Sequence, residues 1–174
     1  MMNHEGSFDI LNSLFDIRHF SISMGTIERK RRATDLSNLT EPAMSAEDWE
    51  DFHRGVVLFN SGQFWESHEA WEQIWKRHPE TSRIFFQGLI QAAAALHQLQ
   101  RGIFHGVDKH LRNALWKLRP FQPAFLGLNV QHLVATLERC HAELDKSRIP
   151  EIRKRWVSKI KMVTVAESPR ETRS

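Results

Sequence analysis

Residues 84–99 form the segment that most constrains the fold, because apolar side chains cover nearly every side of the helix they would form. A helix that is apolar all round has to be covered on all sides by other elements. Four successive alanines at residues 92–95 would let a neighbouring helix approach closely, and Gly102 is the residue type that commonly follows a helix end. The segment therefore predicts the central helix of an all-α bundle.

Four further segments show apolar residues at the three- and four-residue spacing of an amphipathic helix. They cover residues 46–62, 63–77, 107–118 and 130–144. Ser45 precedes the first as a helix cap, and Pro120 follows the third, where it stops the helix. The basic stretch 151–165 indicates a last helix, and no segment shows strand alternation. The fold class expected is a compact all-α bundle of about five helices, flanked by poorly ordered termini.

Composition divides the chain into three parts. Residues 1–44 lack a sustained helical signal and include the charged run 28–32, which predicts a disordered or loosely docked extension. Five apolar residues within it are spaced for a short amphipathic helix that would dock on the body or on a membrane surface, and docking or simple disorder is expected: Phe8, Leu11, Leu14, Phe15 and Ile17. Residues 45–148 are expected to form one helical domain, and residues 149–174 a basic C-terminal segment and tail.

The positive charge of the chain is concentrated near its end. The formal net charge is +3, but residues 146–174 hold nine Lys or Arg against three Asp or Glu, so the remaining body is mildly acidic. This distribution argues against a nucleic-acid-binding domain. No apolar run approaches the roughly 20 residues of a transmembrane helix, no secretory signal is visible, and Cys140 has no partner for an internal disulfide. These features predict a cytoplasmic protein without a transmembrane segment.

The segment 68–75 holds the residues most able to carry chemistry. His68 and Glu72 are four residues apart, so they rise from the same face of a helix, and Glu69 lies three residues before Glu72. These side chains border the apolar stripe that includes Trp75, and partial burial is therefore expected. Because a half-buried imidazole or carboxylate needs polar partners, neighbouring helices should supply them.

Two neighbouring helices offer polar partners in suitable positions. The central helix carries a polar stripe of Arg83, Gln87 and Gln91 on an otherwise apolar surface. On the first helix, His53 lies beside the apolar face, in line with Asn60. We therefore expect a pocket between the helices 46–62, 63–77 and 84–99. It would hold His53, His68, Glu69, Glu72, Gln87 and Gln91, with Asn60, Trp75 and Arg83 around them.

Metal binding has a physical basis in this segment, because an imidazole and a carboxylate four residues apart on a helix can share a divalent ion such as zinc, manganese or iron. His68 and Glu72 are the first candidate ligands, and Glu69 and His53 are weaker ones. The HExxH motif of zinc proteases is not matched, since Glu72 replaces its second histidine. The alternative is an ordinary helical pair, or a hydrogen-bonded network that ties the helices together.

Residues 59–72 and 85–94 read FNSGQFWESHEAWE and FFQGLIQAAA, and in these stretches the chain resembles the DUF309 family of uncharacterised bacterial and archaeal proteins. The family signature H-x-x-x-E-x-x-(W/Y) is filled by His68, Glu72 and Trp75. The resemblance covers about residues 50–120. It implies a small all-helical protein with a motif to which metal binding has been attributed, and it implies no particular reaction.

Two functions of different classes compete. The first is an enzyme or ligand-binding protein in which His68 is a metal ligand or general base and Glu72 a co-ligand, with metal-assisted hydrolysis as the leading chemistry. The second is a non-catalytic helical interaction scaffold whose His/Glu cluster is a structural hydrogen-bond network. Gly55, Ser67, Trp71 and Pro79 fall at the spacing of one tetratricopeptide unit, but no tandem repeat follows. The sequence leaves open whether the chain is an enzyme, whether it binds a small ligand or a protein, and its oligomeric state.

Overall fold

The computed structural model describes residues 36, 39–78, 81–144, 148–157 and 160–165. The chain divides into two units, Met1–Ser37 and Asn38–Ser174, and every element described below lies in the second unit. The expected extension over residues 1–44 lies outside the described residues, apart from residue 36 and residues 39–44, and so does the end of the expected tail.

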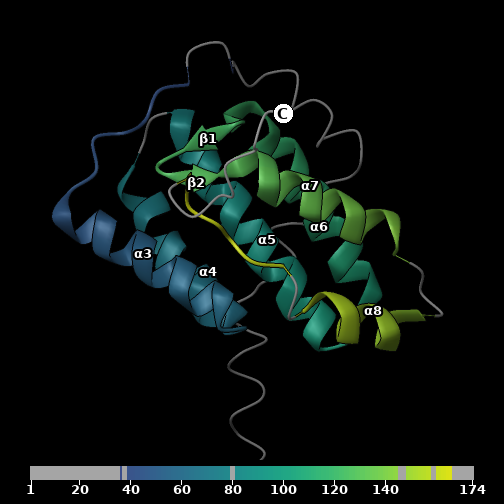
Figure 1. Cartoon of the computed structure of the whole chain (residues 1–174). Helices are drawn as coiled ribbons and strands as arrows, with labels where there is room; N and C mark the ends of the chain where they lie inside the picture. Colours follow the sequence, from purple (N-terminus) through teal and green to yellow (C-terminus); the bar gives the residue numbers. More distant parts are fainter. Residues whose placement is uncertain (1–35, 37–38, 79–80, 145–147, 158–159, 166–174) are drawn as a thin grey trace, which may run out of the picture. The chain divides into compact units, whose positions relative to one another are not determined.

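Six α-helices make up most of the part that the structure describes (Figure 1). They are α3 (Ala46–Asn60), α4 (Phe64–Arg77), α5 (Ile84–Gln100), α6 (Phe104–Leu118), α7 (Val130–Ala142) and α8 (Ile149–Trp156). Short 3₁₀ turns at Thr81–Arg83 and Arg119–Phe121 precede α5 and follow α6. The predicted all-α bundle is confirmed, and the five expected helices lie within a few residues of their predicted bounds.

Helices α3 and α4 form an antiparallel pair whose ends are specified locally. Ser45 and Asp48 make a reciprocal capping box at the start of α3, with the Ser45 amide donating to the Asp48 carboxylate at 2.9 Å. Gly62, at φ +80°, turns the chain towards α4. The helices touch at Gly55, where an added Cβ would lie 2.3 Å from the indole nitrogen of Trp71. Only glycine therefore fits at this crossing.

Helix α5 is central, as its all-round apolar sequence predicts. Twelve of its seventeen residues are buried, and it packs against α4 and α6 as well as against α8. The closest approach of α6 is at Gly88, where a Cβ would lie 2.7 Å from the Leu118 side chain. The alanines at 92–95 are buried too, so small residues line more than one turn of this helix.

The chain after α6 departs from the helical expectation. A two-stranded antiparallel hairpin joins β1 (Ala124–Phe125) to β2 (Leu128–Asn129), and residues 160–165 run beside it instead of extending α8. The Asn129 amide donates to the Val163 carbonyl at 2.8 Å, and the Val165 amide donates to the Gly127 carbonyl at 2.8 Å. Strands of two residues are too short to show alternation, which is why the sequence pattern did not indicate them.

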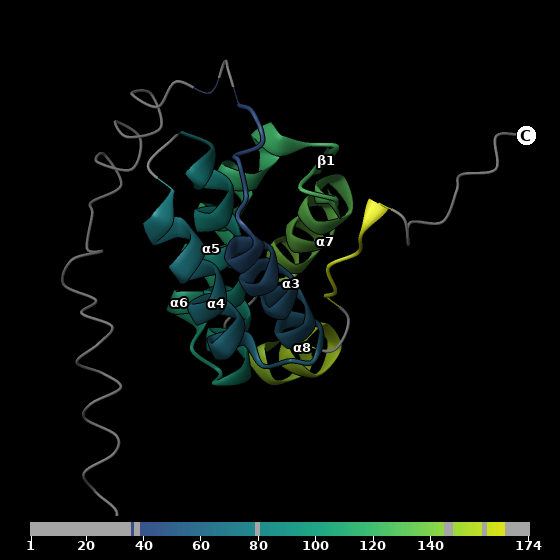
Figure 2. The same ribbon diagram turned by 90° about the vertical axis from the view of Figure 1, so that its left-hand side faces the viewer.

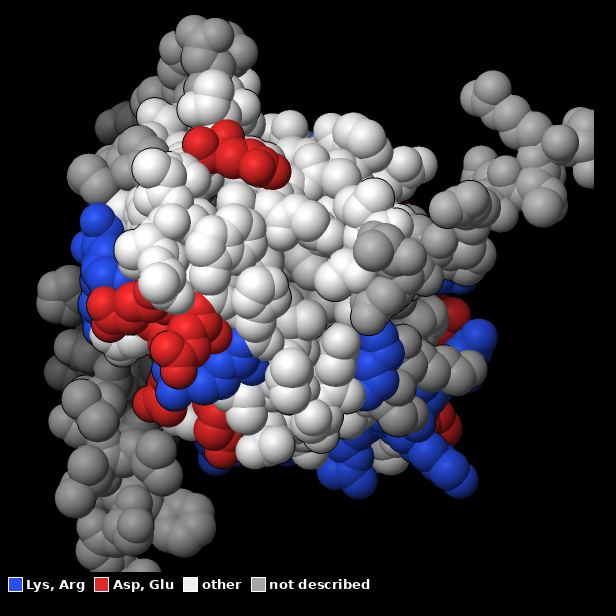
Figure 3. Space-filling model, turned by 60° about the vertical axis from the view of Figure 1, so that its left-hand side comes forward, with Lys and Arg blue, Asp and Glu red and all other residues white. Residues whose placement is uncertain are grey.

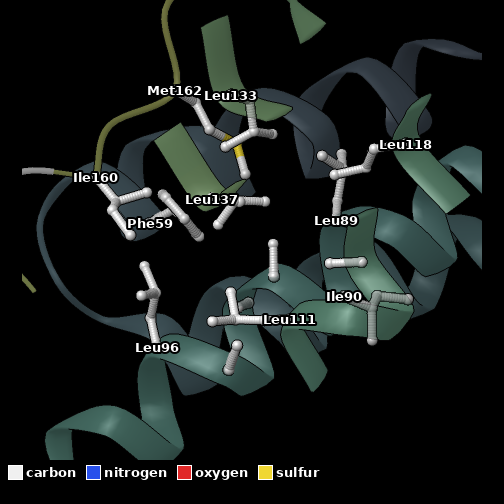
Figure 4. Close-up of a cluster of buried hydrophobic side chains, with 14 of the residues drawn as sticks. Phe59, Leu89, Ile90, Leu96, Leu111, Leu118, Leu133, Leu137, Ile160 and Met162 are labelled. Carbon is white, nitrogen blue, oxygen red and sulfur yellow. The ribbon is translucent and has the colours of Figure 1, made fainter. Parts of the chain in front are cut away.

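The hydrophobic core is shared by helices and by the C-terminal segment. Figure 4 shows Phe59 of α3, Leu96 of α5 and Leu137 of α7 close to Ile160 and Met162. The turned view places α4 and α6 on one side of α3, and α7 with the C-terminal segment on the other (Figure 2). Among the described residues, none of the helices has the length and apolarity to cross a membrane.

Candidate functional site

The segment 68–75 lies within α4, and its polar side chains point to different sides of this helix. His68 is buried, with 6% of its surface exposed, whereas the neighbouring Glu69 is exposed and Glu72 is half-buried. The expected partial burial is thus found for Glu72, whereas His68 is buried more completely than expected. The imidazole and the Glu69 carboxylate point to different surroundings, although they are adjacent in sequence.

His68 lies against aromatic rings. Its imidazole stacks on the indole of Trp65, with the ring centroids 5.3 Å apart and the planes 6° from parallel, and Trp65 in turn lies 5.5 Å from the His97 ring of α5. Burial lowers the pKa of His68 to about 4, against the opposing effect of the Glu72 charge and with a further contribution from His97. The His68 imidazole is therefore neutral at pH 7.

A half-buried imidazole on α6, which the sequence did not single out, lies against the polar side of α5. The Nδ1 of His110 donates to the Oε1 of Gln91 on α5 at 2.7 Å. Burial lowers the pKa of His110 to about 4, and the charges of Lys109 and His68 act in the same direction. We call Trp65, His68, Gln91, His97 and His110 the histidine cluster, which joins α4, α5 and α6.

The two carboxylates of the candidate site border a hollow on the outer surface of α3 and α4. This hollow, of about 430 Å³, is lined by Arg54, Glu66, Glu69, Ala70, Glu72, Gln73 and Lys76. Glu72 Oε1 lies 3.5 Å from Lys76 Nζ, one helical turn further on. Glu72 therefore faces a basic side chain at the surface, Glu69 lines the same hollow as Arg54, and His68 does not line it.

The remaining predicted pocket residues lie in three other surroundings. His53 is exposed on α3 and stacks on Trp49, with ring centroids 5.5 Å apart. The Asn60 side chain holds the C-terminal segment, donating to the Met162 carbonyl at 2.9 Å and accepting from the Met162 amide at 2.8 Å. The Arg83 guanidinium lies 4.3 Å from the centre of the Trp75 ring, and Gln87 is half-buried on α5.

The structure thus pairs Gln91 with His110 and stacks His68 on Trp65, and it places His53 and Asn60 elsewhere. Across the part of the chain that the structure describes, no three His, Cys, Asp or Glu side chains are grouped closely enough to hold a metal ion. Zinc, manganese or iron binding by His68 and Glu72 stays a prediction.

The thiol of Cys140 is buried, and burial raises its pKa to about 12, so it is protonated at pH 7.

A charged network that the sequence did not reveal joins the start of α3 to the end of α4. Arg77 donates to Asp48 Oδ1 and to Asp51 Oδ2, each at 2.7 Å, and His78 Nε2 lies 3.2 Å from Asp48. Burial alone would raise the pKa of Asp48, but hydrogen bonds from Ser45, Arg77 and His78 prevail and lower it to about 2. The acidic residues in the first turn of α3 and the basic ones in the last turn of α4 are visible in the sequence, but the pattern does not show which of them pair.

A larger hollow lies on the other side of α3, and the sequence did not indicate it. It has a volume of about 640 Å³ and is bordered by α3, by the hairpin and by the C-terminal segment. Its lining residues are Phe52, His53, Val56, Leu126, Gly127, Leu128, Thr164 and Val165. We call this hollow the α3 groove. Because three separate stretches of chain form it, no local motif predicts it.

Comparison with known proteins finds a family model that matches residues 52–109. These residues, from Phe52 in α3 to the second turn of α6, match the family model described as "Domain of unknown function (DUF309)". The resemblance to DUF309 is therefore confirmed for this segment. An uncharacterised protein of Aquifex aeolicus (strain VF5) is 28% identical over 96 residues, which are 55% of this chain and 29% of that protein. The chain thus matches less than a third of the length of this relative.

Proposed function

We propose that this chain, with its DUF309 segment at residues 52–109, acts as a non-catalytic helical interaction module in which the histidine cluster is structural. One observation carries the proposal: polar side chains expected to converge on a pocket instead contact other parts of the same chain. Asn60 contacts Met162, Gln91 contacts His110, Arg83 contacts Trp75, and Glu72 contacts Lys76. Side chains used in this way stabilise helix packing.

The protonation state of the histidines supports the same function. At pH 7 both His68 and His110 are neutral, because their pKa values are lowered to about 4. A neutral imidazole can be buried between helices at small cost, whereas a buried imidazolium would need a charged partner. A general base, by contrast, works best with a pKa near the working pH. Low pKa values therefore fit a structural cluster better than proton transfer.

Two measurements test this proposal together: the metal content of the untagged, chelator-free protein, and the thermal stability of its variants. We expect no stoichiometric metal, and we expect His68→Ala to lower the free energy of unfolding by about 2 kcal/mol through lost packing. Glu69→Ala is the matched control, because its side chain is exposed on the same helix and should change stability by less than about 0.5 kcal/mol. Unchanged stability of His68→Ala would contradict the structural role.

The second candidate is divalent-metal binding by His68 and Glu72, with metal-assisted hydrolysis as its chemistry. It is favoured by the neutral form of His68, which is the form that coordinates metals, and by the electrostatic effect of Glu72 on the imidazole. One zinc, manganese or iron ion per chain, lost in both His68→Ala and Glu72→Ala, would establish this function. The same result would overturn the structural role of the cluster.

A further inference from the structure

We propose that two copies of this chain associate through the α3 groove, with their α3 helices antiparallel about a two-fold axis. The groove lies on a different surface from the histidine cluster. A monomeric protein would therefore refute this proposal without refuting an interaction function, and a metal in the cluster would refute the function proposed above without refuting this one.

The α3 groove is apolar and open. Phe52, Val56 and Leu128 contribute to its lining, and its volume is about 640 Å³. Its polar lining side chains are His53 and Thr164, which are fewer than the converging polar groups that usually orient a small ligand. Exposed apolar hollows of this kind are typical of protein contacts.

Apolar side chains project beside the same groove. Trp49 is 36% exposed, Val57 is 65% exposed and Val165, at the groove's edge, is 52% exposed. Trp49 stacks on His53, and Val57 lies one turn after His53 on α3. One face thus carries both a hollow and the apolar side chains to fill it. A two-fold interface requires this property, because each copy presents the same surface to the other.

The charges around the groove suit an antiparallel arrangement of two copies. Glu41 lies at the hairpin end, where its carboxylate accepts from the Leu126 amide at 2.6 Å, and Lys161 lies at the other end, where it donates to the Asn60 carbonyl. In Figure 3, where α3 comes forward, an uncharged area separates an acidic patch from charged patches below it. A two-fold axis across this area brings Glu41 of one copy near Lys161 of the other.

The hairpin that forms one wall of the groove has a fixed conformation in the single chain. Leu126, at φ +48°, adopts a left-handed conformation that costs a non-glycine residue about 1 kcal/mol or more. Its side chain is only 4% exposed, and its amide is fixed by Glu41. Packing and this hydrogen bond therefore keep the hairpin tip in one conformation. A preformed surface loses less conformational entropy on association, which favours binding at this face.

Sedimentation equilibrium of the full chain over a wide concentration range tests the proposal. We expect a reversible dimer whose dissociation constant rises at least roughly tenfold in Val57→Glu, because the two-fold axis places the new carboxylate in the interface twice. Ile103→Glu is the matched control: Ile103 is also an exposed apolar residue, at 41%, but it precedes α6 and does not line the groove. It should leave the dissociation constant unchanged.

A double-mutant cycle tests the orientation of the two copies. Glu41→Gln keeps an oxygen that accepts from the Leu126 amide, and Lys161→Gln keeps a donor for the Asn60 carbonyl. Each variant should weaken the dimer, and the double variant should weaken it by less than the sum of the two. Circular dichroism of each variant establishes that it is folded. A wild-type chain that stays monomeric at the highest concentration would overturn the proposal. A dimer that Val57→Glu leaves intact would overturn it as well, since another surface would then be responsible.

Discussion

The histidine cluster and the α3 groove lie on different sides of α3. In both regions the exposure of the side chains is the opposite of what their residue types suggest. The cluster contains the residue types associated with catalysis, yet its side chains contact one another and are buried or half-buried. The groove contains few such residues, yet it is open and bordered by exposed apolar side chains. Chemically versatile residues therefore do not by themselves mark an exposed site.

The largest expected effect concerns Asn60, which holds a wall of the groove. Replacing it with alanine removes both hydrogen bonds to Met162 and leaves two main-chain groups to find other partners. We expect Asn60→Ala to lower the free energy of unfolding by about 2 kcal/mol, and to release the segment 160–165. Urea unfolding measures the first effect, and amide hydrogen exchange of Met162 measures the second. Ser61→Ala, which removes only an exposed hydrogen bond, is the control.

As the pH is lowered, the contribution of the histidine cluster to stability should decrease before that of the charged network at Asp48. The pKa values of His68 and His110 are about 4 in the folded chain and 6.5 ordinarily, so the unfolded chain binds protons at these residues more readily. The free energy of unfolding is therefore unaffected by them above pH 6.5 and falls as the pH is lowered towards 4. We expect a loss of about 1–2 kcal/mol at His110 between pH 6.5 and 4.5. Unfolding of the wild type and of His110→Gln across this range measures it, and equal pH profiles would contradict the shift.

The Asp48 network should respond only at lower pH. The folded pKa of Asp48 is about 2, below its ordinary 3.8, so its contribution is complete above pH 4 and disappears as pH falls towards 2. Asp48→Asn should therefore flatten the stability profile between pH 4 and 2, and leave the fall between pH 6.5 and 4.5 as it is. A change in the upper range would show that Asp48 is coupled to the histidines.

A smaller difference in stability is expected between variants of Gln91 and of Gln87 on α5. Gln91→Ala leaves the His110 Nδ1–H without its acceptor, which should cost about 1 kcal/mol. Gln87→Ala changes a half-buried residue of the same polar stripe, one turn earlier, and should cost less. Thermal unfolding of both variants compares them directly. Equal losses would mean that the hydrogen bond to His110 contributes nothing measurable.

The helices could be predicted because their signals are local. Periodic apolar residues, the cap at Ser45 and the proline after α6 act within a few turns, and the structure follows them closely. The sequence could also identify His68 as a partly buried polar residue. It could not identify its neighbour His110, because that depends on how α6 is rotated against α5.

The α3 groove and the Asp48 network could not be predicted for a related reason. Each joins residues that are distant in sequence: Val56 with Leu128 and Val165 in the groove, and Asp48 with Arg77 in the network. Residues 160–165 were included in the basic helix expected over 151–165, and they instead pair with the hairpin. Such contacts are fixed by packing, and a single sequence carries no local record of them.

The most direct test of the account is a calorimetric titration of the untagged protein with zinc and with manganese, in the wild type and in His68→Ala. If the histidine cluster is structural, we expect no saturable one-to-one binding in either protein, while His68→Ala unfolds at a lower temperature. Saturable binding of one ion per wild-type chain, lost in His68→Ala, would contradict the account and would make His68 a metal ligand.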